Sequence, residues 1–110
     1  MDSLDEHLEA NSALVEQRLS MGDVASRPRS LDHLASFPRK AVAAAVHDLT
    51  DAGFEVNDVK KGLRRTRIEF SRTDTADLDS ANAFTRQIVE ITNQHGGTYD
   101  GWAGFIVSDS

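Results

Sequence analysis

The sequence predicts an α+β fold in which a four-stranded antiparallel sheet carries two helices on one face, with an additional helix before the first strand. Three observations support this prediction. Apolar residues recur at helical spacing in three segments, they alternate with polar residues in others, and glycine or proline separates most of these segments. A chain of 110 residues is long enough for one domain with a two-layer core.

The first part of the chain predicts an amphipathic helix followed by a strand. The helix is expected over residues 3–21, and Gly22 ends it. Residues 22–29 are polar and are expected to form a linker. A short strand is expected over residues 31–37, because Pro38 cannot donate a hydrogen bond to a continuing sheet. The residues that form the apolar stripe of the first helix are Leu4, Leu8, Val15 and Leu19.

The middle of the chain predicts a helix followed by a β-hairpin. Pro38 suits the first turn of a helix, and Gly53 is the expected stop at its other end. A second strand is expected over residues 54–59, a turn over residues 60–62 and a third strand over residues 63–71. Charged and apolar side chains alternate along the third strand, so its arginines should share the face opposite the core.

The last helix and strand follow the same signals. Asp77 is the expected N-cap of the helix, and two consecutive glycines end it before a strand over about residues 98–107. Strict alternation along this strand sends Tyr99 toward the helices. The same alternation sends Asp100 and Trp102 to the opposite, open face of the sheet.

After the first helix, the order βαββαβ is the split βαβ arrangement of the ferredoxin-like fold, and right-handed crossovers favour this arrangement. We therefore expect an N-terminal amphipathic helix at residues 1–22 and a ferredoxin-like domain at residues 27–110. The first helix must bury its apolar stripe. It can lie across the open face of the sheet, or it can pack on another copy of the chain.

Composition narrows the class of protein. The absence of cysteine excludes disulfides, thiolate metal sites and a cysteine nucleophile, and a cytoplasmic location is expected. The first residues are acidic and no apolar run is long enough to cross a membrane, which argues against a signal peptide or a membrane anchor.

Charge is unevenly distributed along the chain. The formal net charge is −6 at pH 7. Residues 1–25 carry six acids and one arginine, whereas residues 60–67 carry five basic residues and no acid. The acidic and basic segments can neutralise each other within one fold, or they can face different partners.

Two segments carry a family resemblance. The first is LDHLASFP at residues 31–38, followed by the alanine-rich helix and AGFEV at residues 52–56. The second is HGGTYDGWA at residues 95–103. Both resemble the bacterial ribonuclease E inhibitor protein B family (RraB) over about residues 27–107, and the Tyr-Asp-Gly-Trp tetrad is the most specific part.

The resemblance implies a non-enzymatic regulator with a ferredoxin-like fold. Its partner would be a ribonuclease E-type endonuclease of the bacterial cytoplasm, whose cleavage of RNA the regulator reduces, and no cofactor or metal is implied. The sequence departs from the family in one respect. Enteric members carry a long acidic C-terminal tail, whereas the surplus acid of this sequence lies in its first helix.

The expected partner-binding surface is the open face of the sheet, because buried aromatic and arginine side chains dominate the energetics of interfaces. An alternative is that the N-terminal helix covers Trp102 and that its indole N–H is bonded locally. The arginines can instead pair with Asp32, Glu69 or the acidic helix. The residues expected at this surface are Asp32, His33, Arg65, Arg67, Asp100 and Trp102.

Other functions have weaker support. RNA-binding domains of this topology stack bases on outward aromatics, but the third strand presents Arg65, Arg67 and Glu69, so direct RNA binding is not expected. A pair formed by His33 and Asp100 would be a possible acid–base unit. No nucleophile elbow, phosphate loop or metal-ligand spacing accompanies it. A self-associating domain, whose first helix docks on a second copy, is the remaining alternative and implies a homodimer.

Overall fold

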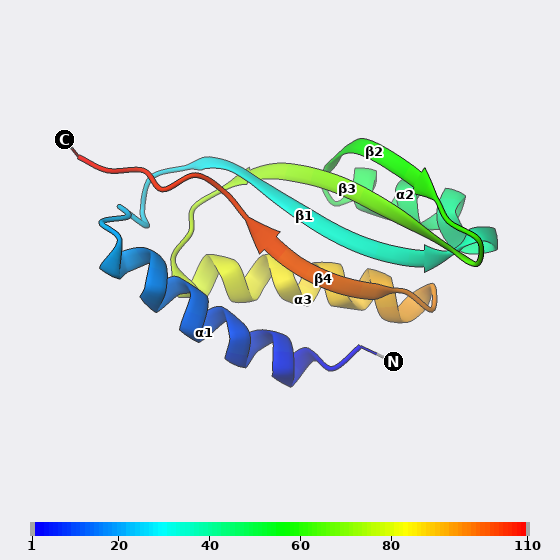
Figure 1. Cartoon of the computed structure of the whole chain (residues 1–110), viewed down its shortest axis with the longest axis horizontal. Coiled ribbons are helices and arrows are strands. Elements are labelled where there is room, and N and C mark those ends of the chain that lie inside the picture. The colour runs from blue at the N-terminus through cyan, green and yellow to red at the C-terminus, as the bar shows by residue number, and fades with distance from the viewer. Residues whose placement is uncertain (1, 110) are drawn as a thin grey trace.

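The structure, a computed structural model, describes residues 2–109. Four strands form one sheet in the order β2-β3-β1-β4, and every neighbouring pair is antiparallel. This order, with two crossover helices, confirms the predicted α+β fold with ferredoxin-like topology (Figure 1). The elements are α1 (Leu4–Ser20), β1 (Arg29–Pro38), a 3₁₀ turn η1 (Arg39–Ala41), α2 (Val42–Asp51), β2 (Glu55–Lys61), β3 (Arg65–Asp74), α3 (Leu78–Gln94) and β4 (Thr98–Ala103).

The core lies between the sheet and the crossover helices. Alternate residues of β1 and β3 point into it, and the apolar face of α3 covers them. Asp77 caps α3 as expected, because its side chain accepts a hydrogen bond from the backbone N–H of Ser80. The largest side chains with no exposed surface are Leu31, Phe37, Leu49, Ile68, Phe70, Phe84 and Ile88.

The first helix lies alongside α3 and runs in the opposite direction (Figure 1). It does not cover the open face of the sheet, so this expected position is wrong. The predicted stripe is also partly wrong, because Leu19 is 52% exposed while Arg18 is 6% exposed. The buried side of α1 is therefore partly polar, and Asn11 is buried at its centre.

The amide of Asn11 joins three elements. Its Nδ2 donates to Thr85 Oγ1 at 2.9 Å and to Asn82 Oδ1 at 3.2 Å, both on α3. Its Oδ1 accepts the indole N–H of Trp102 on β4 at 2.9 Å. A buried side chain whose donors and acceptor are all satisfied holds α1 in one position on the domain.

We expect Asn11→Ala to lower the free energy of unfolding by about 1–2 kcal/mol, because it leaves a buried indole N–H without an acceptor. Urea denaturation followed by circular dichroism measures the change. Ser12→Ala is the control, since Ser12 is the exposed neighbour on the same helix and bonds only within it. Equal stability of the Asn11 variant and the parent would contradict this role.

The β2–β3 hairpin is longer than expected. Lys60 and Lys61 belong to β2 and lie opposite Arg67 and Thr66, so the expected turn over residues 60–62 is wrong. The strands instead turn over residues 62–64. As a result, the basic residues continue the sheet surface instead of forming a loop above it.

A β-bulge in β4 reverses the predicted orientation of Trp102. Leu34 pairs with Gly101 and Ala35 pairs with Tyr99, which leaves Asp100 without a partner on β1. One extra residue in a strand inverts the alternation beyond it. Gly101 has a φ of +112°, which a side chain would strain. Tyr99 and Trp102 therefore both face the helices, and the predicted exposure of Trp102 on the open face is wrong.

Candidate functional site

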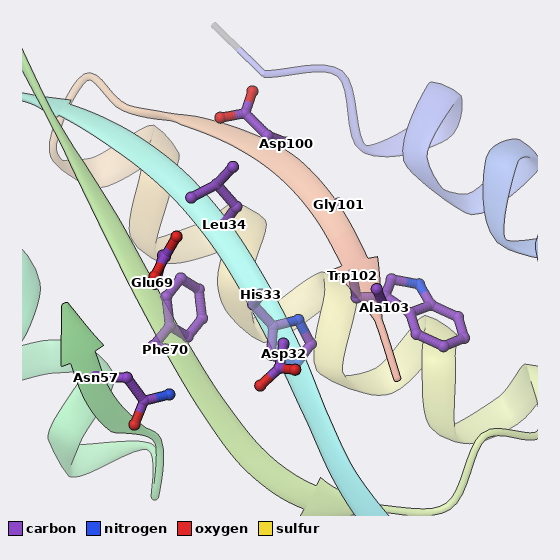
Figure 2. Close-up of a pocket in the computed structure, with 10 residues that line it drawn as sticks. All are labelled: Asp32, His33, Leu34, Asn57, Glu69, Phe70, Asp100, Gly101, Trp102 and Ala103. Carbon is purple, nitrogen blue, oxygen red and sulfur yellow. The ribbon is translucent and has the colours of Figure 1, made fainter. Parts of the chain in front are cut away.

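The open face of the sheet is the candidate site, because none of the three helices covers it. It contains a shallow hollow of about 530 Å³ that spans all four strands. Leu34 lies in its middle, opposite Glu69 on β3 and Gly101 on β4. Figure 2 looks onto this face, with the helices behind the sheet. The side chains that line the hollow from the open face are Asp32, Leu34, Asn57, Glu69, Asp100 and Ala103.

Three carboxylates surround the hollow. Asp32, Glu69 and Asp100 are exposed, and they form no ion pair with any described residue. Asn57 adds an amide at the edge, where its Nδ2 donates to Ser71 Oγ at 2.9 Å. The hollow therefore combines a small apolar floor with unneutralised negative charge, which suits a cationic or hydrogen-bond-donating group of a partner.

Basic side chains lie at the hairpin end of the same face. Arg67 faces Ser36 on one neighbouring strand and Lys60 on the other. The guanidinium of Arg65 donates to the carbonyl oxygens of Ser36 at 3.2 Å and Gly96 at 3.3 Å. Neither arginine pairs with an acid among the described residues, so the alternative of internal charge pairing is not observed.

The predicted surface residues separate into two groups. Asp32, Arg65, Arg67 and Asp100 are exposed on the open face, whereas His33 and Trp102 are buried on the helix side. Both residues border the hollow, but their side chains are buried. His33 points to the helix side because successive side chains of β1 alternate between the two faces of the sheet. Trp102 points to the helix side because of the bulge in β4.

Trp102 is covered by the N-terminal helix, as the alternative interpretation held. It is 8% exposed, and its ring packs edge-on against Phe84 with a centroid distance of 5.3 Å. The guanidinium of Arg18 lies 5.4 Å from the ring centroid, within the range of a cation–π interaction. Together with the bond to Asn11, these contacts make Trp102 a structural anchor for α1.

His33 lies inside an aromatic cluster. Its ring stacks on Phe70 and meets Phe54 and Phe84 edge-on, and a 2.8 Å hydrogen bond joins its Nδ1 and the hydroxyl oxygen of Tyr99. Burial, aided by the positive charge of Arg72, lowers the pKa of His33 to about 3. The imidazole is therefore neutral at physiological pH.

The acid–base pair considered from the sequence does not form. His33 points to the helix side, while Asp32 and Asp100 point to the open face (Figure 2). Tyr99 is 3% exposed, as predicted for a core residue, and burial raises the pKa of its hydroxyl. Within residues 2–109, no three histidine, aspartate or glutamate side chains are grouped to hold a metal ion.

The sequence prediction of the binding surface leaves out two residues of the site, although the alternation of side chains along β3 and β2 indicates that both face outward. Glu69 lines the hollow, and Lys60 lies at the basic end. Glu69 was expected to point outward but only as a partner for arginine. Lys60 was placed in a turn because the length of β2 was underestimated, so its position on the sheet was missed.

The fold and the site define a class of protein: a ferredoxin-like α+β domain with a helix docked beside α3 and a charged, uncovered sheet face. Among the described residues, no helix has the length and apolar character needed to cross a membrane. The family model described as regulator of ribonuclease activity B, RraB, matches residues 8–103, and the chain belongs to this family. The match begins within α1 and so includes most of this helix. A search of curated proteins found no match.

Proposed function

We propose that this protein binds a ribonuclease E-type endonuclease of the bacterial cytoplasm and lowers its cleavage of RNA, as a non-enzymatic regulator without a cofactor. Membership of a family of regulators of ribonuclease activity supports the role. The position of His33, buried and neutral and on the opposite side from the nearby acids, supports binding over catalysis.

The docking surface in this proposal is the open face of the sheet. The observation that carries it is the hollow of about 530 Å³, whose exposed carboxylates form no ion pair with any of residues 2–109. Unpaired charges around an apolar floor fit an interface that pairs them with opposite charges and excludes water. Asp32, Asp100, Arg65 and Arg67 are the proposed contact residues. His33 and Trp102 act from beneath by keeping the sheet in shape.

We expect the double variant Asp32→Lys/Asp100→Lys to weaken binding to the endonuclease by at least about tenfold, because reversed charges would face the cationic groups of the partner. Calorimetry with the purified endonuclease of the same organism measures the dissociation constant. A fluorogenic RNA substrate, cleaved with and without the protein, measures inhibition.

Glu16→Lys/Glu90→Lys is the matched control. Both glutamates are exposed, on α1 and α3, and the variant makes the same change in net charge away from the open face. We expect it to bind like the parent. Equal binding by both double variants, or equal loss in both, would exclude the open face as the docking surface. No binding by the parent would exclude the endonuclease as the partner.

A further inference from the structure

Basic residues are concentrated at one end of the sheet. Of the 12 lysines and arginines of the chain, seven lie near the turn of the β2–β3 hairpin or just after the paired end of β1. All seven are exposed, and the only ion pair that they form with any of residues 2–109 is between Lys60 and the exposed Asp58, at 3.8 Å. The seven residues are Arg39, Lys40, Lys60, Lys61, Arg64, Arg65 and Arg67.

Most of the exposed acids lie elsewhere, and Asp58 on β2 is the one that pairs with Lys60. The exposed acids of α1 form no ion pair with the hairpin, and the carboxylates of the open face surround the hollow further along β1, β3 and β4. The net charge of −6 therefore describes the whole molecule but not this end of it. At short range, the local charge decides which ions are attracted, because salt screens distant charges.

Two adjacent hollows are present at this end. One, of about 270 Å³, is lined by Lys60, Lys61, Gly62, Arg65 and Arg67, so all of its lining residues except the glycine are basic. The other, of about 350 Å³, is lined by Arg65, Asn93, Gly96, Gly97 and Thr98. Arg65 is shared by both. The two hollows together form a path across the end of the sheet, from β2 to the beginning of β4.

Two cationic side chains face each other in the first hollow, and of the two only Lys60 has an acidic partner, Asp58, within residues 2–109. Lys60 and Arg67 are directly opposite each other on neighbouring antiparallel strands and on the same face. Like charges in this position repel and destabilise a sheet. An anion held between the two side chains removes this repulsion. The carbonyl bonds of Arg65 orient its guanidinium at the boundary of the two hollows, and its remaining N–H groups are available to a ligand.

We propose that this end of the sheet binds the phosphodiester backbone of single-stranded RNA. A linear chain with one negative charge per nucleotide fits the cationic first hollow, and the second hollow, which shares Arg65 and is otherwise neutral, leaves room for the chain to continue. The exposed part of the path has no aromatic side chain, so bases are not stacked and binding is independent of sequence. The sequence predicts no direct RNA binding because the third strand lacks outward aromatic residues, but binding of the phosphate backbone does not require aromatic residues.

This inference deepens the proposed function, because RNA is the substrate of a ribonuclease. The regulator would then hold the substrate through the basic hairpin, including Arg65 and Arg67, while Asp32 and Asp100 of the acidic hollow contact the enzyme. The inference rests on the proposed function only for the statement that the bound RNA is the substrate of the enzyme. RNA binding is measured without the ribonuclease, and the Asp32→Lys/Asp100→Lys experiment measures binding to the ribonuclease. Each proposal can therefore fail without the other.

The test uses fluorescence anisotropy of a labelled uridine oligonucleotide of about 12 nucleotides with the purified full chain. One phosphate contact from each of the four basic residues of the first hollow predicts that the affinity for RNA falls about 50-fold between about 50 mM and about 200 mM salt. Lys60→Gln/Arg67→Gln is expected to weaken binding at least about tenfold at the lower salt concentration and to reduce the salt dependence. Both side chains are exposed, and removing their repulsion should not lower the melting temperature.

Arg86→Gln is the control, because Arg86 is exposed on α3 and away from the path. It should bind within about twofold of the parent, apart from the small general effect of net charge. A polyglutamate peptide of the same length represents an acidic protein segment. Tighter binding of the RNA supports the proposal. No RNA binding, an equal loss in Arg86→Gln, or polyglutamate that binds as tightly as RNA would overturn it.

Discussion

Trp102→Ala is expected to lower the free energy of unfolding by about 3–5 kcal/mol, which is the range for removal of a large buried aromatic side chain. The ring fills the space between β4, Phe84 of α3 and Arg18 of α1. Its loss also leaves the buried amide oxygen of Asn11 without its donor. Urea denaturation followed by circular dichroism measures the change. Trp102→Phe should lower the free energy of unfolding by a smaller amount, because this variant keeps an aromatic ring and loses only the hydrogen bond and part of the side-chain volume.

The same variant tests the position of the binding surface. Because the indole lies on the helix side, the folded fraction of Trp102→Ala should bind the endonuclease like the parent, provided that the open face is the docking surface. A Trp102→Ala protein as stable as the parent would contradict its role as an anchor. A variant that is fully folded but no longer binds would place Trp102 at the interface.

Acidification from about pH 7.5 to about pH 4.5 is expected to destabilise the parent protein by about 3 kcal/mol through His33 alone. The pKa of His33 is about 3 in the folded state and 6.5 in its ordinary state. Between these values the unfolded chain binds a proton that the folded protein does not. This stability is complete above the ordinary pKa and is lost progressively as the pH falls toward the folded pKa.

Carboxylates act in a lower pH range. Hydrogen bonds from Thr75 and Ser80 lower the pKa of Asp77, so its contribution is present above the ordinary carboxylate pKa of 3.8 and is lost below it. The fall in stability between about pH 7.5 and about pH 4.5 therefore reports mainly on the histidine.

Two variants isolate this effect. His33→Phe puts a fourth phenyl ring beside Phe54, Phe70 and Phe84, and the slope of stability against pH should be much smaller. His47→Gln is the control, since the side chain of His47 is 73% exposed, and it should keep the slope of the parent. Equal stability of the parent at the two pH values would contradict a neutral, buried His33. A slope that persists in His33→Phe would assign the effect to other groups.

Two local signals for the misplaced side chains were present in the sequence but were outweighed. Gly101 interrupts the last strand, and a glycine inside a strand is typical of a bulge. Asn11 and Arg18 stand at helical spacing from Val15, on the stripe that the helix buries, but the more apolar Leu19 was preferred. Apolar residues usually mark the buried side of a helix. Here, hydrogen bonds to α3 and to residues 104–105 favour the burial of Asn11 and Arg18 instead.

The sequence by itself determined the order of helices and strands, the ferredoxin-like topology, the outward direction of Arg65 and Arg67, and the family. These properties depend on local periodicity, on glycine and proline, and on short motifs, all of which act between residues close along the chain. Only the tertiary structure decided where α1 packs, which face Trp102 occupies, and that acids and bases separate on the open face. These properties depend on pairing between residues far apart in the sequence, and a single bulged residue is enough to reverse a face.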